Sequence, residues 1–125
     1  MGDGTSKRRF KETPCAPIEL PFTSQSMIKV LEYGMDQKNS PYTHQQICHW
    51  CQTFRRYAGP VYSKSPLETA SRIALELGEE FYVHVFDNYT QEELDKLDCS
   101  LVRLPTERFK QFRSWFDMDR PWLKG

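Results

Sequence analysis

Apolar side chains recur every three or four residues in three separate stretches of this chain, and this period constrains the fold most strongly. Such spacing places the apolar residues on one face of a helix. It predicts helices over residues 24–35, 43–58 and 65–77. Thr23 or Ser24 can cap the first of these and Thr43 the second, while residues 65–68 (Ser-Pro-Leu-Glu) form a capping box with proline at the first helical position.

The pattern changes after Gly78, which we interpret as the end of the third helix. Residues 81–86 (Phe-Tyr-Val-His-Val-Phe) are rich in aromatic and β-branched side chains and predict a strand. Residues 101–104 predict a second short strand. A capping box at Thr90 predicts a short helix to about Leu97, and Thr106 can cap a last helix. The fold class expected is therefore α+β and predominantly helical, with about four to five helices and at most a small two-stranded sheet.

The ends of the chain differ in composition from its middle. Residues 1–22 combine glycines, a basic cluster at positions 7–11 and three prolines, and predict a flexible N-terminal tail. We expect residues 23–117 to form a single globular domain, since one domain commonly has about 100–150 residues. Residues 118–125 are then a C-terminal tail.

The charge balance disfavours some partners. The chain has 17 basic and 17 acidic side chains, whereas general nucleic-acid binders need an excess of Lys and Arg. No apolar run approaches the roughly 18 residues that span a bilayer. Gly2 lies where a myristoyl group could be attached, but we do not expect membrane attachment there, because Asp3 follows directly.

The four cysteines help to predict the cellular compartment of the protein. Nothing in the sequence indicates secretion, so we expect reduced thiols in an intracellular, most simply cytoplasmic, protein. His44, Cys48 and Cys51 share one helix face, which leaves open a small zinc-supported domain that would need a fourth ligand. Because that ligand set is incomplete, the sequence predicts no metal and no cofactor.

The motifs of catalysis and phosphate binding are missing. The chain has no GxSxG, GxGxxG or GxxxxGK[ST] motif, and no local signature joins a histidine to a nucleophile. We therefore predict no catalytic residues and no enzyme activity. A nucleic-acid-binding helical module is a second alternative, because the first two helices could form a helix-turn-helix. Arg55 and Arg56, however, lie at the wrong end of the second helix to read bases.

The aromatic content favours an interaction function. Eight Phe, six Tyr and three Trp are many for a chain of 125 residues, and some should lie on the surface, where Tyr, Trp and Arg typically anchor protein interfaces. We expect a small non-enzymatic protein-interaction or regulatory domain that binds another protein through exposed aromatic and charged residues. Contacts are expected beside the prolines, at Tyr62, Arg120, Trp122 and Leu123.

Overall fold

The computed structural model describes residues 10–60, 65–119 and 121. In this part of the chain there are five α helices, three single turns of 3-10 helix (η1–η3) and no strand. The elements are, in chain order, α1 (Ser24–Met35), η1 (Gln37–Asn39), α2 (His44–Ala58), α3 (Glu68–Asn88), α4 (Gln91–Asp95), η2 (Cys99–Leu101), α5 (Thr106–Ser114) and η3 (Trp115–Asp117).

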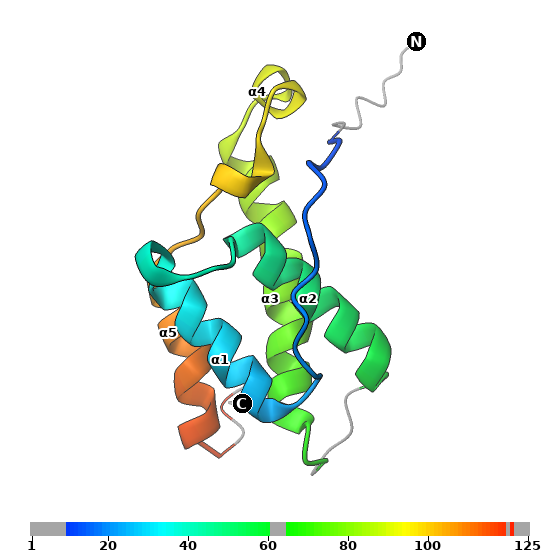
Figure 1. Cartoon of the computed structure of the whole chain (residues 1–125), viewed down its shortest axis with the longest axis vertical. Coiled ribbons are helices and arrows are strands. Elements are labelled where there is room, and N and C mark those ends of the chain that lie inside the picture. Colours follow the sequence, from blue (N-terminus) through cyan, green and yellow to red (C-terminus); the bar gives the residue numbers. More distant parts are fainter. Residues whose placement is uncertain (1–9, 61–64, 120, 122–125) are drawn as a thin grey trace.

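Two helix pairs build the core. The long helices α2 and α3 pack along each other, and α1 packs against α5 (Figure 1). The short helix α4 lies at one end of the molecule, beyond these pairs. The predominantly helical character expected from the apolar spacing is therefore confirmed. The largest of the fully buried side chains are Phe54, Phe81, Phe109 and Phe112.

Threonine side chains begin three of the helices, as the sequence predicts. Thr23, Thr43 and Thr90 are the N-caps of α1, α2 and α4, and each hydroxyl accepts a bond from a backbone N–H of the first turn. At Thr43 and Thr90 the capping box is complete, because Gln46 and Glu93 bond back to the cap. The other two helices begin differently: α3 has Leu67 as its N-cap and α5 has Pro105, neither with a side-chain cap bond.

The strand predicted over residues 81–86 is wrong. Helix α3 continues through Gly78 to Asn88, and Phe81 and Val85 are buried on the face that already carries Leu77. These three residues lie four positions apart, so the helical period does not change after Gly78. The aromatic and β-branched composition of this stretch reflects burial in the core, which overrides the intrinsic preference of those side chains for strands.

The strand predicted over residues 101–104, and with it the small sheet, is also wrong. Leu101 is the last residue of η2, and Val102 is extended. Val102 and Leu104 are buried while Leu101 and Arg103 are exposed, so the alternation seen in the sequence does place side chains on two sides. No strand elsewhere in the described ranges lies beside this segment to complete a ladder.

Residues 10–22 lie in an extended path along α2 (Figure 1, blue). Ile18 is buried, and Phe10, Leu20 and Phe22 pack partly buried against the core. The division into an N-terminal tail, a domain and a C-terminal tail stays a prediction. We call residues 10–22 the docked segment below.

Candidate functional site

The docked segment is held to α2 by side chains of the helix that bond its backbone carbonyls. Trp50 Nε1 donates to the carbonyl of Leu20 at 3.2 Å, and Gln46 Nε2 donates to that of Ala16 at 2.9 Å. These bonds satisfy carbonyls of a segment that has no helix or sheet of its own. The docked segment and α2 therefore form one continuous surface.

Glu12 ties the start of this segment to both long helices. Its Oε1 accepts from the Tyr82 hydroxyl of α3 at 2.7 Å, while its Oε2 accepts from Gln45 Nε2 of α2 at 2.9 Å and pairs with His49 Nε2. Burial, and next the bond to Glu12, raises the pKa of Tyr82 to about 12, so its hydroxyl stays a donor at neutral pH.

Thr13 extends the attachment toward the far end of the molecule. Its hydroxyl donates to the carbonyl of Leu97 at 3.2 Å and accepts from the backbone N–H of Cys99 at 3.1 Å. One hydroxyl therefore acts as both donor and acceptor, and it attaches the docked segment to the stretch of chain from α4 to η2.

An aromatic cluster follows at the other end of the segment. The Phe22 ring lies 5.6 Å from Trp50, 5.8 Å from Phe54 and 5.1 Å from Tyr57, measured between ring centroids. Three of the four rings are buried or half-buried, but Tyr57 is 68% exposed. The cluster thus begins in the core and ends in solvent.

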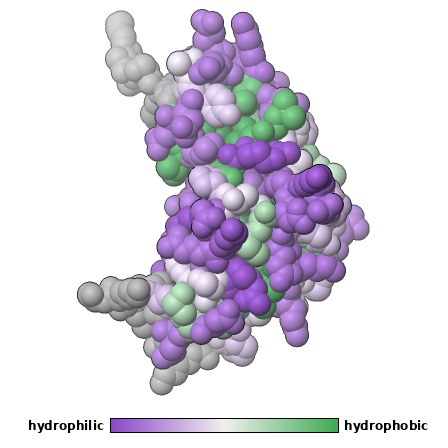
Figure 2. Space-filling view, turned by 90° about the vertical axis from the view of Figure 1, so that its left-hand side faces the viewer, coloured by the Kyte–Doolittle hydropathy of each residue, from purple (hydrophilic) through white to green (hydrophobic). Residues whose placement is uncertain are grey.

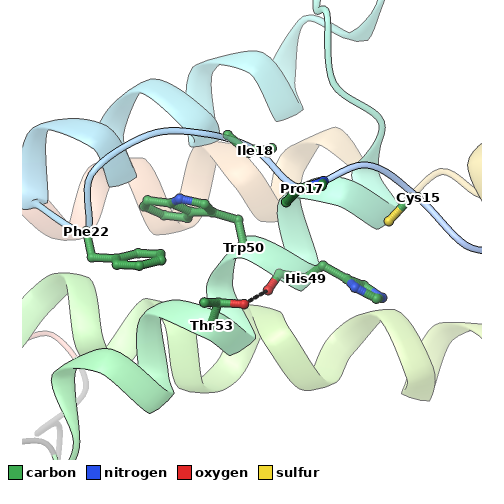
Figure 3. A pocket seen from close by; sticks show the side chains of 7 residues that line it. All are labelled: Cys15, Pro17, Ile18, Phe22, His49, Trp50 and Thr53. Atoms are coloured by element: carbon green, nitrogen blue, oxygen red, sulfur yellow. Dashed lines mark hydrogen bonds between the residues drawn. The ribbon is translucent and has the colours of Figure 1, made fainter.

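A hollow of about 200 Å³ adjoins this cluster, between the docked segment and α2 (Figure 3). Phe22 and Trp50 lie at one end of it, and Cys15 and His49 at the other. We call it the aromatic hollow; its lining residues are Cys15, Pro17, Ile18, Phe22, His49, Trp50 and Thr53. Small-molecule sites usually measure roughly 300–1,000 Å³, so this volume suits one inserted side chain better than a cofactor.

The Cys15 thiol in the aromatic hollow is poorly activated as a nucleophile. Burial, followed by the nearby carboxylate of Glu12, raises the pKa of Cys15 above its usual value. The thiolate is the nucleophilic form of cysteine, and this environment disfavours it. His49, at the same end of the hollow, has its Nε2 engaged by Glu12.

The candidate zinc ligands are also used in packing. Cys48 and Cys51 are fully buried, and His44 is 1% exposed. His44 Nδ1 accepts from the backbone N–H of Leu104 at 2.8 Å, and Nε2 bonds the carbonyl of Gly34 at 2.9 Å, so neither nitrogen is directed at a metal. Among residues 10–60, 65–119 and 121, no group of three or more His, Cys, Asp or Glu side chains could hold a metal ion.

The residues predicted as partner contacts, Tyr62, Arg120, Trp122 and Leu123, lie outside the described residues. What the sequence reasoning missed is the pairing of α2 with the docked segment. The available signal was the alternation of Ile18, Leu20 and Phe22 with Glu19 and Pro21, which is typical of an extended segment but does not show where that segment packs.

The other large exposed apolar side chains of the described residues do not line the aromatic hollow. In the described part of the chain, the large exposed hydrophobic residues besides Tyr57 are Val83, Leu101 and Met118. Figure 2 shows hydrophobic surface collected toward the α4 end of the face that is on the left in Figure 1. Single exposed apolar residues are normal, whereas the aromatic hollow combines exposed apolar surface with a concave shape.

Comparison of the chain with models of protein families, with curated proteins and with solved structures found no match. None of the helices in the described residues has the length and apolar character needed to cross a lipid bilayer.

Proposed function

We propose that this chain is a small non-enzymatic protein-interaction or regulatory domain that binds its partner at the aromatic hollow and at the Tyr57 ring beside it. The observation that carries the proposal is the exposure of Tyr57. This ring is 68% exposed although it stacks on Phe22 at the edge of a concave apolar surface. Tyr and Trp are the side chains that most often dominate the energy of protein interfaces.

The size and lining of the aromatic hollow indicate what it would receive. Pro17, Ile18, Phe22 and Trp50 offer apolar walls, and the hydroxyl of Thr53 lies at its border. A partner segment that inserts one aromatic or branched aliphatic side chain would fill about 200 Å³. The docking of one anchor residue into a pocket is a common arrangement in protein interfaces.

The alternative functions receive less support. The engaged nitrogens of His44 disfavour a zinc-supported domain. A nucleic-acid-binding module would need a continuous basic surface, and the aromatic hollow has no Lys or Arg in its lining. Tyr62, Arg120, Trp122 and Leu123 remain proposed as additional contacts.

The test is to select peptides that bind the full chain from a random displayed library and to map where they bind. With ¹⁵N-labelled protein, we expect the largest amide shifts at His49, Thr53 and Tyr57. Shifts centred instead on Leu101 or Val83 would place the interface elsewhere and overturn the proposal. Failure to recover any binding peptide would also count against it.

A further inference from the structure

A second hollow, of about 210 Å³, lies between α2 and α3. We call it the α2–α3 hollow, and its lining residues are Gln52, Arg55, Ala74, Leu75, Gly78 and Glu79. Gly78 helps to form it, because a Cβ at this position would lie 3.1 Å from Gln52 Cγ. Gln52 Nε2 in turn donates to the carbonyl of Gly78 at 2.9 Å, which fixes that side of the hollow.

Arg55 is the lining residue of this hollow whose side chain lacks the expected hydrogen-bond partners. Its Nε and Nη1 are shielded from solvent, yet neither has a hydrogen-bond partner among the described residues. Arg108 of α5, by contrast, is paired with Glu76 and Glu80 of α3. Buried donors in folded proteins almost always have an acceptor, so we expect the Arg55 side chain to turn toward an acceptor that enters the hollow.

Two internal explanations for Arg55 fall short. A cation in the last turn complements the dipole of α2, but the exposed Arg56 already supplies one without burying any nitrogen. Glu79 lines the same hollow, but no ion pair joins it to Arg55 in the described structure. Neither feature accounts for the shielding of Nε and Nη1.

We propose that the α2–α3 hollow is a carboxylate subsite in which Arg55 binds an acidic side chain of the partner. This inference deepens the proposed function and rests on it. The planar guanidinium matches a carboxylate, which accepts two parallel N–H···O bonds. Ala74 and Leu75 give an aliphatic wall for the methylene groups of an incoming Glu side chain. Glu79 disfavours a doubly charged phosphate more than a singly charged carboxylate.

The position of this subsite suits one partner segment that also reaches the aromatic hollow. Gln52 lines the α2–α3 hollow and the next residue, Thr53, lines the aromatic hollow. The two hollows therefore open on either side of the exposed strip of α2 that carries Thr53 and Arg56. A segment that crosses this strip would place an apolar side chain in one hollow and an acidic side chain in the other.

The probe for the test is hexaglutamate with both ends blocked, titrated into the full chain while the side-chain Nε–Hε signal of Arg55 is followed by NMR. We expect saturable binding that shifts this signal. Arg55→Gln should weaken binding about tenfold or more. The matched control Arg56→Gln, which removes the same charge from an exposed position, should change it less than about twofold. Glu79→Gln should tighten binding, because it removes a like charge.

Several results would overturn the subsite. The first is an equal loss of hexaglutamate affinity in Arg55→Gln and Arg56→Gln. The others are no shift of the Arg55 signal at saturation and tighter binding of inorganic phosphate than of hexaglutamate. Arg55→Lys keeps the charge without the planar fork, and it should also bind weakly if Arg55→Gln does not fold. Hexaglutamate has no apolar side chain, so Tyr57→Ala should leave its affinity unchanged. Failure at the aromatic hollow can thus be distinguished from failure here.

Discussion

His44 has a single neutral form that satisfies both of its neighbours. Since Nδ1 accepts from the N–H of Leu104, the proton lies on Nε2, which donates to the carbonyl of Gly34. A second proton would place a donor on Nδ1 against the donor of Leu104. Burial in the core lowers the pKa of His44 to about 4. A histidine with metal-ligand spacing is therefore a core residue that joins α1 to the segment before α5.

The lowered pKa of His44 predicts a loss of stability in mild acid. The unfolded chain takes up this proton near pH 6.5 and the folded chain only near pH 4, so the contribution is complete above pH 6.5. It is lost as the pH falls through that window, by about 3 kcal/mol at most. Carboxylates titrate there too, so the measurement is the difference in unfolding free energy between wild type and His44→Gln at pH 7 and pH 4. That difference should shrink in acid, and an equal difference at the two pH values would contradict the prediction.

Gly34 predicts a second effect at the scale of one residue. A Cβ at this position would overlap the ring of Phe109, which is fully buried in α5. Although alanine gains about 1 kcal/mol of helix propensity over glycine, overpacking a core contact costs about 1–3 kcal/mol. We expect Gly34→Ala to lower the unfolding free energy, as measured by urea denaturation. Gly78→Ala, whose nearest neighbour is the flexible Gln52 side chain at 3.1 Å, is the control and should be milder. Equal effects would show that the contact between α1 and α5 is not tight.

Helix α3 shows how far an element can be predicted from its residues. The threonine caps and the apolar spacing were sufficient for α1 and α2, because those signals are local. The end of α3 could not be predicted from such local signals. Gly78 can end a helix or allow it to approach a neighbour closely, and only its packing against Gln52 decides between these two roles. The four-residue spacing of Leu77, Phe81 and Val85 was the sequence signal to weigh above composition.

The docked segment could not be placed from the sequence for a different reason. Its contacts link residues 30 to 86 positions apart, from Trp50 with Leu20 to Thr13 with Cys99. No local period reports such pairs. The aromatic hollow lies between this segment and α2, so its position was equally hidden, although its aromatic residues were visible as a surplus.

The attachment of this segment predicts the effect of removing Glu12. Glu12→Ala leaves Tyr82, Gln45 and His49 without their shared acceptor, and should cost about 1–3 kcal/mol of unfolding free energy. Glu19→Ala changes the same charge in the same segment at an exposed position, and should cost less than about 0.5 kcal/mol. Equal midpoints for the two variants in thermal denaturation would mean that the segment is not held at Glu12.

The four helices α1, α2, α3 and α5 together bury the core, and few large apolar side chains of residues 10–60, 65–119 and 121 are exposed to solvent. Tyr57 and Val83 are both exposed, on α2 and α3 respectively, but only Tyr57 belongs to an aromatic cluster at the edge of a hollow. If exposure alone determined where a partner binds, Tyr57 and Val83 would contribute equally to binding. The proposed function requires that they differ.

Isothermal titration of one selected peptide against wild type, Tyr57→Ala and Val83→Ala, with thermal denaturation of each protein, shows whether Tyr57 anchors the interface. Truncation of an interface anchor costs about 2 kcal/mol or more, so Tyr57→Ala should weaken binding about 30-fold. Its melting temperature should stay near that of wild type, since the ring is 68% exposed. Val83→Ala should bind as wild type does. Unchanged affinity in a folded Tyr57→Ala protein, or an equal loss in Val83→Ala, would contradict the account.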